Sequence, residues 1–357
     1  MVMQLRVYDK NLNFQGLIEN QTSLVWHRKY FEVGKFELHA PVTDSNLALL
    51  KMGNILSYRG AKEGGVIEHM IITDEYKGGG REREIECRGR FLESYMDRRL
   101  IKQTFNFSGR VETAMRSILS NAVPIPLVQL GEDNGFTERI DFQATYKGVL
   151  DYETKLAKYS NIGFRFVPSF TDKTITFETY KGLDRSFRQT ERNRVVFSDS
   201  YGNLNEAEYE TNDQLYKNVV YVGGQGEGAD RKVIVVGDDT LTGLNRREVF
   251  LSASDISQGE MTEAEYESAL RQRGEQLLTE DVVTSSFECQ TSAEGNFIYK
   301  RHYDLGDIIT VRKPEWDIEV DLRVTELQET YENGALTISP TLGTPLPSVV
   351  DWSDKNG

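Results

Sequence analysis

Four histidines are the first residues to consider as metal ligands or proton carriers: His27, His39, His69 and His302. A helical metal site places two ligands four residues apart on one face, and none of the four has a partner at that spacing. We therefore expect each histidine to lie on a strand, at the surface or an interface of a β-unit. The chain also lacks the Gly-x-Ser-x-Gly motif of a hydrolase nucleophile.

The two cysteines, Cys87 and Cys289, each lie in a strand-like run of residues. One disulfide between these runs is one interpretation, and two reduced buried thiols are the other. The second is favoured for a protein made in a cytosol, where thiols stay reduced. Neither cysteine has a local nucleophile signature, so both are expected to fill a core.

Two acidic segments, Asp238-Asp239 and Glu132-Asp133-Asn134, offer oxygen ligands for a cation. Both lack the full calcium-loop pattern, so we expect solvated turns. Asp and Glu are abundant, so pairs of carboxylates like those of a glycosidase can always be suggested, but a sequence does not show the distance between them. The glycine-rich segment Gly223–Gly228 resembles a phosphate loop, but no Lys-Ser/Thr pair follows it, and a flexible crossover is expected. The sequence thus predicts no catalytic residue, no metal and no cofactor, and hence no enzyme.

Composition limits the classes of protein further. The chain has 357 residues and a formal net charge of −14, and its mean hydropathy is −0.50. This length favours two to four domains. The acidic balance argues against nucleic-acid binding as the main task, because phosphate contacts need clustered Lys and Arg. No apolar run approaches the ~20 residues of a membrane helix, and no signal peptide is apparent, so we expect no membrane insertion by this chain itself.

The elements that must position any site are mostly strands. In the last complete unit, residues 304–343, the sequence predicts three strands: the β-rich residues 308–311, the alternating residues 322–327, and residues 336–338. A turn near Pro314 separates the first two, and a hairpin turn at Asn333-Gly334 separates the last two. The first hundred residues repeat this pattern at similar spacings. The landmarks are Phe36, Gly53, Asn54, Gly79 and Gly89 in the first copy, and Phe287, Gly306, Asp307, Gly334 and Gly343 in the second. Chance similarity between β-proteins is the alternative to a duplication.

The predicted fold class is mainly β with α+β. Two similar small antiparallel β-barrels, the second interrupted, are joined by an α+β domain and a helical/β insertion. In the α+β domain an amphipathic helix covers Val111–Ala122, with Ser108 as its N-cap. In the insertion a capping box begins at Thr262. The predicted boundaries are 1–103 for the first barrel, 104–192 for the α+β domain, 193–222 and 282–343 for the second barrel, 223–281 for the insertion, and 344–357 for a C-terminal tail.

Several short motifs together resemble one protein family. They are Gly34-Lys35-Phe36-Glu37-Leu38, Gly53-Asn54-Ile55, Gly65-Val66-Ile67-Glu68, residues 218–231 and Leu305-Gly306-Asp307-Ile308. The combination resembles the siphophage tail-tip hub proteins, which are related in fold to the baseplate hub of contractile tails and to the N-terminal part of Tal-like proteins. The resemblance covers roughly residues 1–343. Many Tal-like proteins continue into a receptor-binding or wall-degrading region, whereas this sequence stops at Gly357.

The resemblance implies a structural virion protein, made in the cytoplasm of a bacterial host and located at the tail tip. It implies a homotrimer whose six barrels match a sixfold tail tube. Its neighbours would be a distal tail protein or the tail-tube ring, and tip or receptor-binding proteins. Tape-measure protein and DNA would pass through the bore without specific binding. The alternatives are a baseplate protein that binds a cell-wall glycan, for which exposed Trp and Tyr around a groove would argue, and a peptidoglycan hydrolase.

Overall fold

Alternating apolar and polar residues in the first hundred positions form seven antiparallel strands. Every second side chain along β3 and β4 is buried, because successive strand residues point to opposite faces of a sheet. The computed structural model describes residues 3–77, 80–122, 124–144, 146–204, 206–280, 284–290 and 296–343. The elements of this first unit are β1 (Leu5–Tyr8), β2 (Phe14–Ile18), β3 (Ser23–Lys29), β4 (Lys35–Pro41), α1 (Asp44–Leu49), β5 (Ile55–Tyr58), β6 (Gly65–Lys77) and β7 (Gly80–Phe91).

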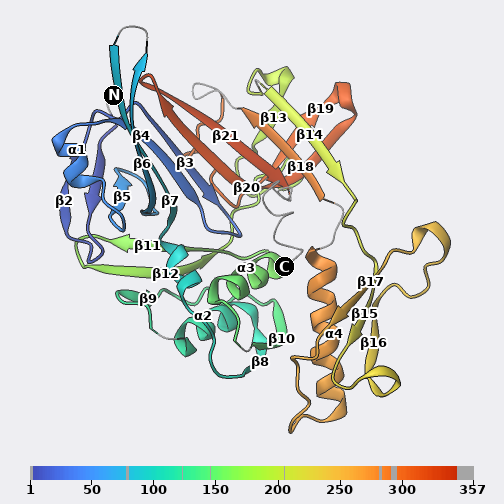
Figure 1. The fold of residues 1–357 in the computed structure, drawn as a ribbon. Coiled ribbons are helices and arrows are strands. Elements are labelled where there is room, and N and C mark those ends of the chain that lie inside the picture. Colours follow the sequence, from blue (N-terminus) through green and yellow to red (C-terminus); the bar gives the residue numbers. More distant parts are fainter. Residues whose placement is uncertain are drawn as a thin grey trace.

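The α+β domain follows and shares a hydrophobic core with the first unit, below which it lies in Figure 1. The sequence predicts Ser108 as the N-cap of the first helix of this domain, but the structure places Ser108 elsewhere. It lies in β8 opposite Asp141, and Arg110 takes the N-cap position without a side-chain hydrogen bond, because the strand runs directly into the helix. The elements are the 3-10 helix η1 (Leu92–Arg98), β8 (Phe105–Arg110), α2 (Val111–Asn121), β9 (Val128–Leu130), β10 (Arg139–Ala144), α3 (Val149–Ser160), β11 (Gly163–Ser169) and β12 (Thr174–Tyr180).

The second β-unit is built from two separate stretches of chain. A two-residue turn joins its last two strands, and both turn residues have the positive φ that such hairpins require: 52° at Asn333 and 78° at Gly334. Its elements are β13 (Val196–Ser198), η2 (Asp199–Tyr201), β14 (Glu206–Asn212), β18 (Thr284–Gln290), β19 (Ile308–Lys313), η5 (Pro314–Trp316), β20 (Ile318–Glu332) and β21 (Ala335–Gly343).

The insertion between β14 and β18 is a three-stranded sheet covered by one helix (Figure 1). The sequence predicts that residues 218–222 belong to the second β-unit. Instead β15 pairs with β16 and β17, because Val220 and Val222 are buried with Tyr266 and Leu270 of the helix. The elements are β15 (Val219–Gly223), η3 (Gly228–Asp230), β16 (Val233–Gly237), η4 (Gly243–Asn245), β17 (Glu248–Ser252) and α4 (Glu263–Glu280).

Two local predictions in the insertion have different outcomes. The capping box forms: the amide of Thr262 donates to Glu265 at 2.8 Å, and the amide of Glu265 donates to the Thr262 hydroxyl at 3.3 Å. The Gly223–Gly228 segment is not a crossover. It is the connection of the β15–β16 hairpin, where the amide of Gly224 donates to the carbonyl of Lys232.

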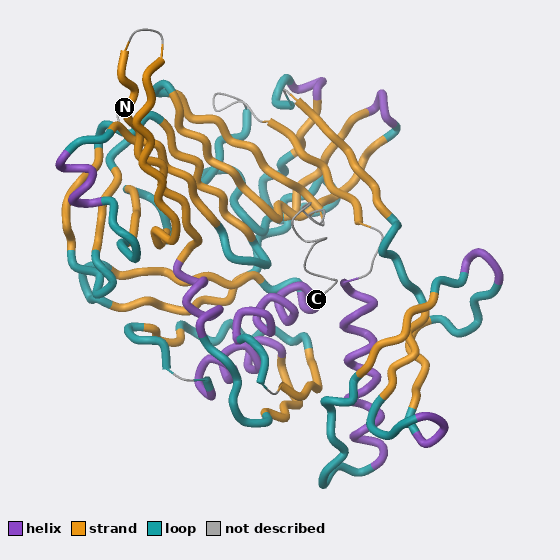
Figure 2. Tube along the Cα trace, in the orientation of Figure 1, coloured by secondary structure: helices purple, strands orange, loops and turns teal. Residues whose placement is uncertain are grey.

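The two β-units form one sheet, which Figure 2 shows as a run of strands across the upper part of the molecule. Its order is β14-β18-β21-β20-β3-β4-β7-β6-β5-β1-β2, with β19 and β13 branching from β20. The antiparallel, mainly β prediction is confirmed. Neither β-unit forms a closed barrel among the described residues, because the edge of β3 is occupied by β20 of the other unit.

Candidate assembly surface

The turns at Gly53 and Gly306 have the same backbone geometry. The amide of Gly53 donates to Ile67 and that of Gly306 to Val324, both at 2.8 Å. The same partners donate back: Ile67 to the carbonyl of Asn54 at 2.9 Å, and Val324 to that of Asp307 at 2.8 Å. Both glycines have positive φ, at 83° and 92°. The two turns therefore hold the start of β5 against β6, and the start of β19 against β20, in the same way.

Strand order and register also correspond between the units. The series β3-β4-β7-β6-β5-β1 matches β14-β18-β21-β20-β19-β13, although the last pair is antiparallel in the first unit and parallel in the second. β6 has a bulge directly after Ile67, and β20 has one directly after Val324. Phe36 lies opposite Gly89, and Phe287 lies opposite Leu342.

This register changes one of the predicted correspondences. Gly89 takes the place of Leu342 rather than of Gly343. At Gly89 a Cβ atom would lie 1.7 Å from the carbonyl oxygen of Val66, so the close approach of β7 to β6 at this position requires glycine. Gly343 instead has a positive φ of 89°. Gly79, the predicted counterpart of Gly334, lies outside the described residues.

Asn54 and Asp307 follow the two glycines and use their side chains differently. The Asn54 amide donates to the carbonyl of Leu49, the last residue of α1, at 2.8 Å. The Asp307 carboxylate is buried and accepts from the amide of Leu183 at 2.7 Å and from Arg185 at 2.8 Å. Asp307 thereby ties the second unit to the segment that leaves the α+β domain.

β3 and β20 join the two units edge to edge. They run antiparallel, with Glu326 opposite Lys29, Glu329 opposite Trp26 and Glu332 opposite Ser23. The eight strands β14-β18-β21-β20-β3-β4-β7-β6 thus form a continuous band, four strands from each unit. We call this set of strands the band.

A buried arginine holds this junction together. Arg28 on β3 is only 2% exposed and donates to Glu63 of the first unit at 3.0 and 2.9 Å. It also donates to Asp304 and Tyr299 of the second unit, at 2.7 and 2.6 Å. Although burial opposes its charge, these acidic partners raise the pKa of Arg28 and keep it ionised. The guanidinium therefore bridges carboxylates of both units.

A buried glutamate on β20 completes the junction. Glu329 accepts from Tyr58 at 2.7 Å, from Tyr299 at 2.8 Å and from Tyr331 at 2.8 Å, and it pairs with Lys300 at 3.1 Å. Burial alone would raise the pKa of Glu329, but Lys300 and the hydroxyl donors outweigh it and lower that pKa. Together with the Arg28 contacts, this polar network fixes how the units sit against each other.

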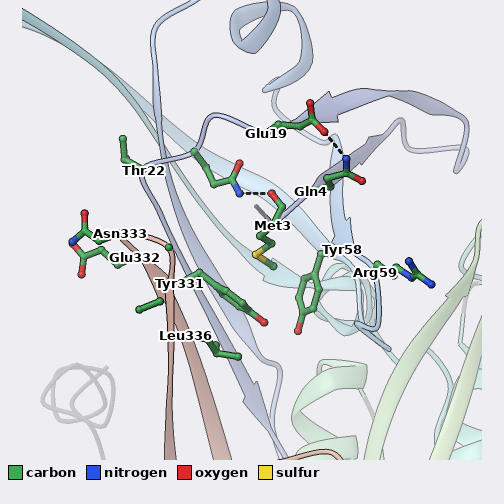
Figure 3. A pocket seen from close by; sticks show the side chains of 13 residues that line it. Met3, Gln4, Glu19, Thr22, Tyr58, Arg59, Tyr331, Glu332, Asn333 and Leu336 are labelled. Atoms are coloured by element: carbon green, nitrogen blue, oxygen red, sulfur yellow. Dashed lines mark hydrogen bonds between the residues drawn. The ribbon is translucent and has the colours of Figure 1, made fainter. Parts of the chain in front are cut away.

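A pocket of about 860 Å³ opens beside this junction. Figure 3 shows Tyr58 and Tyr331 lining it together with Met3, Arg59 and Leu336. Both tyrosine hydroxyls donate to Glu329, and Tyr58 is buried. These rings belong to the junction, so they do not form the exposed aromatic platform that a glycan site would need.

One face of the band is buried in the hydrophobic cores, and the other is polar. We call the second the polar face. Acidic side chains outnumber basic ones on it: the acids are Glu37, Glu68, Glu75, Glu82, Glu84, Glu86, Glu208, Glu210, Glu288, Glu326 and Glu332, and the bases are Lys29, Lys35, Arg88 and Arg90. Burial, followed by the charges of Glu208 and Glu326, raises the pKa of Glu288. The face therefore carries a concentrated negative field.

The histidines have separate surroundings. His27 pairs with Glu326 at 2.5 Å, and the His302 ring accepts from the amide of Ile298. His69 lies on the exposed part of β6. His39 contacts Glu37 at 3.0 Å and Glu84 at 3.1 Å; burial opposes its protonation, but these carboxylates raise the pKa of His39.

One of these histidines belongs to a cluster that the sequence spacing missed. Ligand atoms of Glu37, His39 and Glu86 lie within 4.8 Å of one another. They come from two neighbouring strands, so helical spacing could not find them. Arg88 pairs with both Glu37 and Glu86, which makes the cluster an ion-pair network.

The remaining predicted candidates have structural partners. Cys87 and Cys289 are free and buried in the cores of different units, and burial raises the pKa of the Cys87 thiol to about 12. Asp133 pairs with Arg110, while Asn134 donates to the buried Glu112. Asp238 caps the following turn at Thr240, and Asp239 pairs with Arg246 at 2.7 Å. Glu132 contributes its backbone carbonyl, which accepts from Arg116.

None of the helices in the described ranges is long and apolar enough to cross a membrane.

Comparison with known proteins supplies the family. Residues 4–344 match the model of the siphovirus ReqiPepy6 Gp37-like protein family. The comparison with curated protein sequences gave no match. The fold is similar to that of a tail protein from Neisseria meningitidis MC58, with a TM-score of 0.60, 16% identity, and 96% of this chain and 97% of that chain covered.

Two prophage proteins are similar over comparable lengths. The 43 kDa tail protein of prophage MuSo2 from Shewanella oneidensis has a TM-score of 0.57 and 10% identity, with 95% and 98% of the chains covered. Prophage tail protein gp18 from Listeria monocytogenes EGD-e has a TM-score of 0.56 and 12% identity, with 99% and 98% covered. The resemblance noted in the sequence is thus confirmed at the level of family and fold. This chain belongs to the siphovirus ReqiPepy6 Gp37-like protein family and has the fold of solved phage tail proteins.

Proposed function

We propose that this protein is a structural component of a phage tail, a homotrimeric hub at the distal end that adapts the sixfold tail tube to the tip. The observation that carries the proposal is the side-by-side placement of two units with corresponding strand order, turns and bulges in one sheet. Three such chains present six near-equivalent units around one axis. A threefold protein can then meet each subunit of a sixfold tube with nearly the same contacts.

The shape of the units favours one orientation of the ring. The strands β1, β2, β5, β13 and β19 lie on the core side of the band. In a ring this bulk belongs on the outside, where the circumference is larger, and the polar face then lines the bore. Because phosphates bind clustered cations and are repelled by carboxylates, an acidic lining lets DNA pass without adhering.

The proposal includes partners and excludes catalysis. A distal tail protein or the tube ring would dock on one end of the hub, and tip or receptor-binding proteins on the other. Tape-measure protein and DNA would pass through the bore, and the chain would be made in the cytoplasm of the host before it joins the virion. The function is geometric and needs no cofactor. The carboxylates of the junction and the acidic turns serve ion pairs and caps within the fold.

Cryo-electron microscopy of the tail that contains this chain tests the proposal directly. We expect a ring of three chains, in which Gly53 and Gly306 occupy corresponding positions of alternating units about 60° apart. Permanent contacts of this kind usually bury about 2,000 Å² or more. A ring of six chains, or two units that are not related by rotation about the tail axis, would refute the hub.

A further inference from the structure

The two ends of the band are strand edges without a partner among the described residues. β14 ends the sheet and pairs with β18 alone. Beyond its bulge, β6 pairs with β7 on one side, from His69 to Lys77, and β5 reaches only Val66 and Gly65. Open edges of this length expose rows of backbone N–H and C=O groups, and natural sheets normally cover or protect them.

The correspondence between the units shows what covers such edges elsewhere in this molecule. Residues 69–75 of β6 correspond to residues 326–332 of β20, because both follow the equivalent bulge. Residues 206–212 of β14 correspond to residues 23–29 of β3, because Tyr209 and Trp26 lie opposite Phe287 and Phe36 respectively. Within the chain, these two counterparts, 326–332 and 23–29, pair with each other along their whole length.

We propose that β6 of one copy pairs antiparallel with β14 of the next copy in the register of the β20–β3 junction. His69 then lies opposite Asn212, Ile72 opposite Tyr209, and Glu75 opposite Glu206 of the neighbouring copy. This inference rests on the proposed trimeric ring and specifies its contacts. The eight-strand band of each chain continues into that of the next, so three chains close one sheet around the bore and leave no free edge in the band.

The side chains at these edges fit such a junction. Ile72 is 49% exposed and Tyr209 is 36% exposed, and both lie on the core side of the band. Their counterparts in the internal junction, Glu329 and Trp26, are 1% and 0% exposed. The proposed register places Ile72 against the Tyr209 ring and buries both, as aromatic and β-branched residues do across strands.

Charges keep the edge of β14 from pairing indiscriminately. Glu208 and Glu210 alternate with Ala207 and Tyr209, so the carboxylates stay on the polar face while the core side remains apolar. Glutamates at an exposed edge oppose stacking of identical β14 strands, because like charges would lie across from each other. Opposite β6, Glu210 lies across from Ile71 and Glu208 across from Thr73, which are uncharged. Only the pair at the end of the register, Glu206 with Glu75, places like charges across from each other. The middle of the β14 edge therefore accepts β6 without charge repulsion.

Cysteine pairs in the assembled tail test the register. Directly opposite residues of antiparallel strands have Cβ atoms about 4.5–5.5 Å apart, close enough for oxidation or a short thiol cross-linker. We expect Ile72→Cys with Tyr209→Cys to give a covalent trimer in tail particles on non-reducing electrophoresis, and Met70→Cys with Thr211→Cys to do the same. The matched control, Ile72→Cys with Ala207→Cys, keeps the same face but is displaced by two residues, and should remain monomeric.

The outcomes separate this inference from the proposed function. Particles that contain three copies of the chain by quantitative mass spectrometry, yet cross-link only in the displaced pair or in neither predicted pair, would overturn the strand pairing and leave the trimer standing. A copy number other than three would overturn the hub itself. Single-cysteine variants, which should incorporate normally and give dimers at most, show that folding is intact. The buried native cysteines are unchanged in every variant.

Discussion

Gly53 and Gly306 lie in different β-units and make the same hydrogen bond, with each amide donating at 2.8 Å to a carbonyl on the long strand that follows, from Ile67 and Val324 respectively. Their surroundings differ. A Cβ at Gly53 would meet nothing within 4 Å, whereas one at Gly306 would lie 2.4 Å from the ring of Tyr30. The same backbone requirement is thus combined with open space in one unit and with close packing in the other.

This difference predicts unequal costs for the same substitution. Gly53→Ala should lower the free energy of unfolding by about 1 kcal/mol, because alanine is strained at positive φ. Gly306→Ala should cost several kcal/mol, roughly 3 or more, because the strain is combined with a clash against a buried ring. Urea unfolding of the two variants measures both. Equal losses would show that packing at Tyr30 does not matter.

Arg28 at the junction should contribute far more to the stability of the fold than Arg90 on the polar face. Arg28→Met leaves Glu63 and Asp304 without their shared cation, and we expect a loss of about 3–5 kcal/mol. Arg90→Met removes exposed pairs with Glu68 and Asp97 and should cost less than about 1 kcal/mol. Thermal unfolding compares the two variants. A similar small loss in both would mean that the junction is held by its strand pairing alone.

The buried carboxyl group of Glu93 should make the stability of the protein depend on pH. Burial raises the pKa of Glu93 to about 8, although its carboxylate accepts from the amide of Phe166 at 2.8 Å. Because the folded pKa lies above the ordinary value of 4.5, the protonated group contributes stability fully below pH 4.5. That contribution is lost as the pH rises through 8. The loss amounts to about 1.4 kcal/mol per pKa unit, on the order of 5 kcal/mol in total.

Glu93→Gln tests this titration, because glutamine stays neutral and keeps an oxygen that accepts from Phe166. We expect the stability of the variant relative to the wild type to rise between pH 5 and pH 8 and then level off. Glu315→Gln, at a side chain that is 79% exposed, serves as the control and should show no such trend. A difference between Glu93→Gln and the wild type that is independent of pH would contradict the assignment.

Charge on the polar face should decide whether the protein retains DNA. Glu82→Lys with Glu332→Lys adds cations to that face, and we expect this variant to bind a short DNA duplex at low salt and release it as the salt concentration rises. Glu227→Lys with Glu260→Lys makes the same charge change on the insertion and should bind much less. Fluorescence anisotropy measures both. Equal binding by the two variants would show that net charge matters and its position on the band does not.

The proposed absence of catalysis has its own assay. Purified protein should release no dye from labelled peptidoglycan above the level of buffer, because Glu63 of the junction and Asp133 and Asp239 of the turns are engaged in ion pairs. Release of dye that is abolished by a single carboxylate substitution would establish a hydrolase and refute the structural role.

Local patterns determined much of this fold. Alternation of apolar and polar residues located the strands of the first unit, and Asn333-Gly334 located a hairpin, because period and turn chemistry are properties of neighbouring residues. The capping box at Thr262 was also readable, since its two partners are three residues apart. The landmarks around Gly53 and Gly306 pointed to a repeated unit for the same reason.

Long-range pairing was decided only by the tertiary structure. Nothing local to residues 219–223 says that their partners are β16 and β17, and nothing local to β3 says that β20 closes its edge. The Arg28 network and the Glu37–His39–Glu86 cluster join side chains from separate strands, so no spacing along the chain marks them. A strand offers similar backbone groups to every edge, and the choice of partner depends on the packing of the whole sheet.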